Sequence, residues 1–248
     1  MEIFLLQLLN AVVYSMLLFV LAAGLSLIFG QMDFINLCHG AYYLLGGYIG
    51  LSTVRWMDNF WIALIVAPLA VGNLAYLLEY FFLRDLYGRS QHMQQVLFTF
   101  GVALILEDVM QWTWGADVLK ITQPEILQGS VPLFQGSFPI YRLALIPFGI
   151  ILFAIMYLFM KKTHLGAILR AGVSDAEMVT GLGINVERVF AGVYFVGAAL
   201  AALAGVLGAP ILNLYPGLDF EVLIIALVII VIGGMGSLKG AFISSLII

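Results

Sequence analysis

The chain has 248 residues, of which 63% are hydrophobic and only 10% are charged, with a formal net charge of −4. Soluble domains carry about 25% charged residues, so this composition, with a mean hydropathy of +1.10, excludes an ordinary water-soluble protein. The single cysteine excludes a disulfide within the chain. The sequence therefore predicts a polytopic membrane protein.

A membrane-spanning helix needs about 20 mostly apolar residues. Seven stretches meet this requirement: 8–30, 36–54, 60–83, 94–114, 140–160, 189–211 and 218–234. A further apolar run begins at Gly240 and reaches Ile248, but its rise of about 13 Å is less than half of the hydrocarbon core. We therefore expect an all-α transmembrane bundle of about eight spans, the last incomplete or truncated, forming one domain over residues 1–248.

Basic residues indicate how the bundle is oriented. They concentrate in two connections, with Arg84 and Arg89 in the first and Lys161, Lys162, Arg170 and Arg188 in the second. Cytoplasmic loops carry an excess of Lys and Arg, and two spans separate these connections, so both are predicted to be cytoplasmic. The N-terminus and the loop 115–139 then lie outside.

The stretch "FINLCHGAYYLLGGYIG" brings polar residues into an apolar chain. A zinc site needs three or four ligands, and the other histidines, His92 and His164, fall in predicted cytoplasmic connections. Neighbouring residues on a helix do not face each other, which argues against a catalytic pair of Cys38 and His39. The remaining interpretations are a substrate pathway involving Asn36 and His39, or a satisfied structural contact.

Glycines follow these polar residues on the same predicted span. Gly40 shares a helical face with Asn36, and Gly46 and Gly47 would let the helix break or let substrate pass close to the backbone. Small residues spaced four apart on another span favour close helix packing instead: Gly197, Ala201, Gly205 and Ala209. We assign Asn36, His39, Gly40, Gly46 and Gly47 to a predicted substrate pathway.

Acidic residues within the apolar runs leave a second interpretation open. Glu79 lies about one turn before Arg84 and is expected to reach the interface. Glu107 and Asp108 are the kind of carboxylates that proton-coupled carriers use. Trp112, two residues before a second tryptophan, marks an interface belt just beyond them, which favours a boundary position.

The connection 161–188 is long for a turn and has no apolar run. Ser174 has the spacing of an N-cap, with Glu177 three residues on, and Gly181 and Gly183 can end a short helix. Such a surface helix is either unremarkable or a docking element for a cytoplasmic partner. The sequence "GGMGSLKG" lacks the Ser or Thr of a phosphate-binding loop, so any ATP must bind another chain.

Four segments together resemble the LivH-type permease subunits of branched-chain amino acid ABC transporters. They are "GLSLIFGQMDFINLCHGAYYLLGGYIG", "LFTFGVALILEDVMQWTWG", "RAGVSDAEMVTGLGINVERVFAGVYFVGAALAALAGVLGAP" and "VIIVIGGMGSLKGAF". The Asn-x-x-His-Gly element and the Gly-Gly-x-Gly-Ser turn are specific when they occur together.

The resemblance implies a non-enzymatic subunit of the bacterial inner membrane. Its partners would be a LivM-like permease, two cytoplasmic ATPases that bind magnesium and ATP, and a periplasmic binding protein, with no nucleic acid and no cofactor in this chain. The residues that would couple to the ATPase are Ser174, Asp175, Ala176, Glu177, Gly181 and Gly183. Branched-chain amino acids are the expected substrate, with urea, short amides and small aromatic acids as alternatives, and a stand-alone carrier or channel as the runner-up class.

Overall fold

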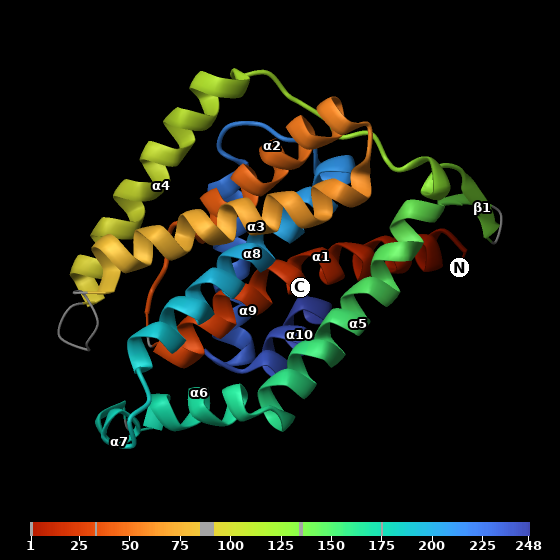
Figure 1. Ribbon diagram of the computed structural model, residues 1–248. Helices are drawn as coiled ribbons and strands as arrows, with labels where there is room; N and C mark the ends of the chain where they lie inside the picture. The colour runs from red at the N-terminus through yellow and green to blue at the C-terminus, as the bar shows by residue number, and fades with distance from the viewer. Residues whose placement is uncertain (1, 33, 85–91, 134–135, 175) are drawn as a thin grey trace.

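A computed structural model describes residues 2–32, 34–84, 92–133, 136–174 and 176–248 (Figure 1). Most of them are helical. The helices are α1 (Glu2–Met32), α2 (His39–Met57), α3 (Phe60–Leu78), α4 (His92–Trp114), α5 (Ile140–Lys162), α6 (His164–Ser174), α7 (Ala176–Gly181), α8 (Val186–Leu212), α9 (Leu218–Gly233) and α10 (Leu238–Ile247). A π-helical turn, η1 (Glu79–Leu83), extends α3, and a 3-10 turn, η4 (Glu125–Leu127), lies between α4 and α5.

Within the described residues, five helices are long and apolar enough to cross a membrane, namely α1, α3 with its π-helical turn, α4, α5 and α8. Their bounds agree with the predicted spans to within three residues, except that α1 begins six residues earlier than predicted. The count rises to six when α9 and α10 are taken as one bent span, so the prediction of about eight spans is not confirmed. The multi-pass helical bundle itself is confirmed.

The sequence predicted one complete span over 218–234 and a partial eighth span after Gly240. The structure has α9 and α10 at these positions, but a sharp bend of 115° joins them, so the pair makes at most one bent span. Gly234 and Gly236 have φ angles of 86° and 84°, which lie in the left-handed region that favours glycine. Ser237 then caps α10, because its Oγ accepts a hydrogen bond from the Gly240 amide at 3.1 Å. A methyl group on Gly236 would overlap Gly30 of α1, so the Gly-Gly-x-Gly-Ser motif forms a turn seated against α1.

The long helix α8 lies at the centre of the bundle and packs against α1, α2 and α3 (Figure 1). α5 runs along α1 on one side, and α4 contacts α2 on the other. α2 is not among the five span candidates, although 36–54 was predicted as a span. Protein surrounds α2, and glycines and tyrosines form much of its buried surface, so its hydropathy is lower than that of a lipid-facing helix.

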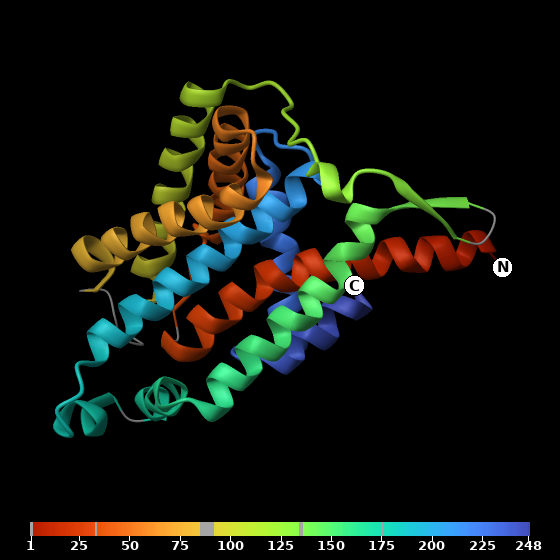
Figure 2. The same ribbon diagram turned by 45° about the vertical axis from the view of Figure 1, so that its right-hand side comes forward.

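A small antiparallel sheet, which was not predicted, adds to the mostly helical fold. Strands β1 (Ser130–Leu133) and β2 (Gly136–Pro139) pair with Ser130 opposite Pro139 and project from the bundle beside the start of α1 (Figure 2). Further along the same face, Leu119 and Leu214 exchange backbone hydrogen bonds of 2.8 and 2.7 Å. These contacts order the connection between α4 and α5, which the sequence predicted only as an external loop.

Candidate functional site

The N-terminus of α2 lies deep inside the bundle rather than at its end. The Nε2 atom of His39 is 3.0 Å from the Leu21 carbonyl oxygen of α1. Leu21 precedes the last residue of α1, Met32, by eleven positions, which is a rise of about 17 Å. The non-helical segment before α2 therefore runs back along α1, and α2 starts about three turns inside the end of α1.

Asn36 shapes the turn that begins α2. Its side chain is 1% exposed, and its Oδ1 accepts a hydrogen bond from the Cys38 amide at 3.0 Å. The next amide, Leu37, donates to the Thr99 Oγ1 of α4 at 3.2 Å. Within the described residues, Asn36 Nδ2 has no hydrogen-bond partner. Asn36 thus combines a structural role, which the sequence left open, with an unused buried donor.

His39 joins α1 to α2. The side chain is fully buried, and because a carbonyl oxygen only accepts, the Nε2–H donates to Leu21. Nδ1 then bears a lone pair, for which the described part of the chain offers no donor. Gly24 of α1 leaves room for the ring, since a methyl group there would lie 3.1 Å from the His39 Cε1.

The N-terminus of α9 meets the N-terminus of α2 at this depth. A methyl group on Gly40 would overlap the Asp219 carbonyl oxygen in the first turn of α9, so the two backbones are in direct contact. Asp219 is 1% exposed, and its Oδ1 has no hydrogen-bond partner in the described residues. Interrupted helices whose N-termini converge within a bundle form the binding sites of many transporters.

Sequence reasoning missed Asp219. The signal that could have found it is a carboxylate two residues after Gly217, at the start of the long apolar run "LDFEVLIIALVIIVIG", where an ionisable group is costly unless it has a function. The meeting of α2 and α9 could not be found in this way, because it joins segments about 180 positions apart in the sequence.

Gly46 and Gly47 lie against protein rather than beside an opening. A methyl group on Gly46 would overlap Ala202 of α8, and one on Gly47 would lie 2.5 Å from a Leu214 side-chain carbon. α2 continues through both glycines without a break. They allow α2 and α8 to pack closely, which is the role we assigned to the Gly197 stripe, and their predicted part in a pathway stays a prediction.

Buried tyrosines line the contact between α2 and α8. The hydroxyl groups of Tyr42 and Tyr194 lie 3.3 Å apart, and the Tyr194 ring also packs edge-on against Phe34. The Tyr43 hydroxyl is buried beside Gly208, and no hydrogen-bond partner for it occurs in the described residues. Composition alone did not single out these tyrosines, since aromatic residues are frequent throughout the chain.

The connection between α5 and α8 contains the predicted short helix as α7. Gly181 is its last residue, and Gly183 follows with a φ of 83°, while its amide donates to the Thr180 carbonyl at 2.9 Å. This is the glycine-terminated helix end that the sequence predicted. Ser174, predicted as the N-cap of this short helix, is the last residue of the preceding helix α6. The helix α6 itself was not predicted. Asp175 and the side chains of Ser174, Ala176 and Glu177 lie outside the described residues.

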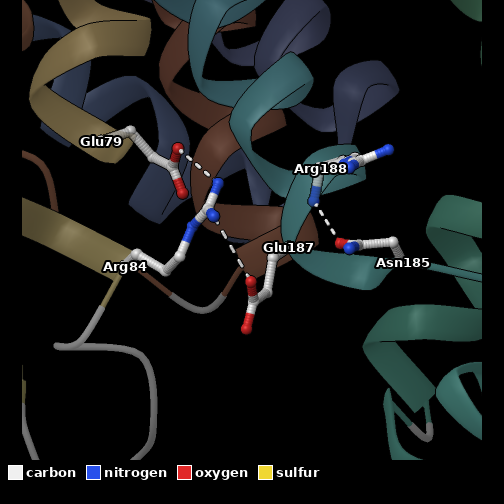
Figure 3. Close-up of polar contacts among 5 residues, drawn as sticks. All are labelled: Glu79, Arg84, Asn185, Glu187 and Arg188. Atoms are coloured by element: carbon white, nitrogen blue, oxygen red, sulfur yellow. Dashed lines mark hydrogen bonds and ion pairs between the residues drawn. The ribbon is translucent and has the colours of Figure 1, made fainter. Parts of the chain in front are cut away.

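An arginine links the two basic connections at one end of the bundle (Figure 3). Arg84, at the end of the π-helical turn, forms ion pairs with the buried Glu79 at 3.7 Å and with Glu187 of α8 at 3.4 Å. Asn185 caps α8 by accepting a hydrogen bond from the Arg188 amide at 3.0 Å. The two connections predicted to share a side of the membrane therefore do lie at the same end.

The carboxylates of the alternative interpretation lie away from this arrangement of ion pairs. Glu107 is partly buried on α4, and Asp108 beside it is exposed. Trp114, further along α4, stacks on Tyr48 and donates from Nε1 to Ser52 Oγ at 2.7 Å. No group of three or more His, Cys, Asp or Glu side chains that could hold a metal occurs in the described part of the chain.

The bundle and its buried junction of interrupted helices define a multi-pass membrane protein with the architecture of a transporter. The family described as "Branched-chain amino acid transport system / permease component" matches residues 7–248. The chain belongs to this family, so it is the permease component of a branched-chain amino acid ABC transport system, a transport protein and not an enzyme.

Several known proteins are similar to the chain over nearly all of its length. The LivH permease protein of Salmonella typhimurium is 26% identical, with 99% of this chain and 83% of the relative covered. The BraD permease protein of Pseudomonas aeruginosa is 28% identical, with 98% and 83% covered. A probable LivH protein of Methanocaldococcus jannaschii is 27% identical, with 96% and 77% covered. A search of the solved structures gave no significant match.

Proposed function

We propose that the chain forms half of the translocation path of an ATP-driven importer for branched-chain amino acids. The observation that carries this proposal is the family match over residues 7–248. The names of the LivH and BraD relatives, which are high-affinity branched-chain amino acid permeases, favour these substrates over urea, short amides or small aromatic acids. The other half of the path would come from a LivM-like permease, and a periplasmic binding protein would deliver the substrate.

The end of the bundle that carries Arg84 and Arg188 faces the cytoplasm in this proposal. Lys161 and Lys162 at the end of α5, and Lys239 at the start of α10, add to the positive charge there. An excess of basic residues is typical of cytoplasmic loops. The membrane would be the bacterial inner membrane, with the N-terminus outside.

The helix α7 is the proposed contact with the ATPase subunits, which would bind magnesium and ATP. Met178 of α7 is 66% exposed, and Leu182 just after it is 72% exposed. Two large apolar side chains on a short helix beyond the end of the bundle suit burial in a groove of another protein. Gly181 and Gly183 would fix the direction in which this helix presents them. The predicted coupling residues Ser174, Asp175, Ala176 and Glu177 belong to the same proposed contact.

The junction of α2 and α9 is the proposed narrow part of the path. A neutral amino acid carries one carboxylate and one ammonium group. The unused Asn36 Nδ2 donor and the helix N-terminus at His39 suit the carboxylate, and the Asp219 carboxylate suits the ammonium group. Opening would require α2 and α9 to separate at Gly40, where they now touch.

The test is co-purification from detergent-solubilised membranes. The wild-type chain should retain two ATPase subunits and a second permease, whereas Met178→Glu and Leu182→Glu should lose the ATPases and retain the permease. Ile126, which is 78% exposed at the opposite end, supplies the control Ile126→Glu, which should retain all partners. A wild-type chain that purifies without ATPases and still transports leucine would contradict the proposal and direct attention to Glu107 and Asp108.

A further inference from the structure

A groove of about 560 Å³ opens between α5 and α8. Leu27 of α1 and Leu165 and Leu169 of α6, at one end, complete its lining. Its walls are aliphatic side chains, methionines and one phenylalanine. Among the lining residues only Arg188 is charged, and it lies at the end of the groove that α6 lines.

The charge of Arg188 is not neutralised within the described part of the chain. Its neighbour Glu187 pairs with Arg84 instead, and the Arg188 side chain extends away from that pair (Figure 3). The hydrogen bond drawn to Arg188 in Figure 3 is made by its backbone amide, which donates to Asn185 Oδ1. Lys161 and Lys162 lie at the same end of α5, so the local charge is positive.

The dimensions of the groove favour a hydrocarbon chain as the occupant. From Arg188 to Leu200 the groove follows α8 for twelve residues, which is a rise of about 18 Å. This length is close to half of the bilayer core of about 30 Å, the part that one leaflet fills.

We infer that the groove binds an anionic phospholipid, with an acyl chain along α8 and the phosphate at Arg188. Basic pockets between membrane helices bind anionic headgroups, and an arginine contacts a phosphate through two hydrogen bonds. An amino acid substrate does not suit the groove, because its lining offers no acceptor side chain for an ammonium group. This inference is independent of the transported substrate.

Native mass spectrometry of the purified chain, with its accompanying subunits, tests the inference. Equal amounts of phosphatidylglycerol and phosphatidylcholine with the same acyl chains are added, and the bound fractions are compared. Both lipids carry the phosphate, but the choline group of phosphatidylcholine is cationic and is repelled by Arg188, so wild type should prefer phosphatidylglycerol about fivefold. Arg188→Gln should lose this preference and still bind both lipids.

A second variant tests the acyl site directly. Gly192 lines the groove, and a side chain added there meets no atom within 4 Å, so Gly192→Phe should fold normally and fill the groove. It should lose both lipids. Gly101 of α4 has equally open surroundings and supplies the control Gly101→Phe, which should bind as wild type does. Equal binding of the two lipids by wild type, undiminished binding by Gly192→Phe, or a protein segment found in the groove of the assembled complex would each overturn the inference.

Discussion

Gly40 is the residue at which α2 and α9 come into contact, and the available space is smaller than a methyl group. We predict that Gly40→Ala forces the two helices apart and lowers the free energy of unfolding by about 1–3 kcal/mol, the usual cost of overpacking. The measurement is thermal unfolding of the purified protein in detergent.

Gly101 supplies the control for this prediction, because a methyl group there meets no atom within 4 Å. Gly101→Ala should leave the melting temperature unchanged or raise it slightly, since alanine favours the helix. Equal melting temperatures for Gly40→Ala and wild type would show that α2 and α9 are not in contact in the membrane.

His39 is a second residue whose contact makes a clear prediction. His39→Ala removes the hydrogen bond to Leu21 and leaves a cavity between α1 and α2, so it should destabilise the protein by about 2–4 kcal/mol and reduce uptake. His39→Gln retains an N–H donor and should recover part of both losses. Unchanged uptake, expression and melting temperature in His39→Ala would exclude any role for this residue.

At the scale of elements, the end of α7 depends on the left-handed backbone of Gly183. Gly183→Val should disturb the end of the helix, because a β-branched residue is strained at a positive φ, whereas Gly183→Asn should be tolerated. We expect Gly183→Val to reduce ATPase stimulation in the assembled transporter several-fold while the melting temperature of the bundle stays the same. Equal ATPase stimulation in both variants would show that the end of α7 is not needed for coupling to the ATPase subunits.

The ion pairs of Arg84 connect the end of α3 to the start of α8. Arg84→Gln removes one ion pair of the buried Glu79 and should lower the free energy of unfolding by about 1–2 kcal/mol. Glu187 is 59% exposed, so Glu187→Gln should change it by less than about 0.5 kcal/mol. Denaturation of both variants under the same conditions checks that Arg84→Gln loses more stability than Glu187→Gln. A larger loss for Glu187→Gln would contradict this prediction.

At the scale of the whole molecule, the sequence predicted the long apolar helices better than the contacts between distant segments that position them. α5 and α8 were predicted to within three residues at each end, because long apolar runs indicate them directly. The deep start of α2 was not predicted, and the Gly-Gly-x-Gly-Ser turn between α9 and α10 was predicted without its contact with α1. Both depend on contacts between distant segments, such as Gly40 with Asp219 and Gly30 with Gly236.

The candidate site was predicted only in part, because it also depends on contacts between distant segments. Asn36 and His39 attracted attention as polar residues in an apolar chain, and the structure brings both to the junction of α2 and α9. Asp219 completes that junction from the other side. It was missed because one carboxylate near the start of an apolar run resembles an interfacial residue until its burial is known.

The most direct test of the account is leucine uptake into proteoliposomes that contain the purified assembly, its binding protein and ATP on the side of the ATPases. The account predicts uptake that requires ATP hydrolysis and all subunits, and that is lost in Met178→Glu but retained in Ile126→Glu. Leucine uptake by this chain alone, without ATP, would contradict it.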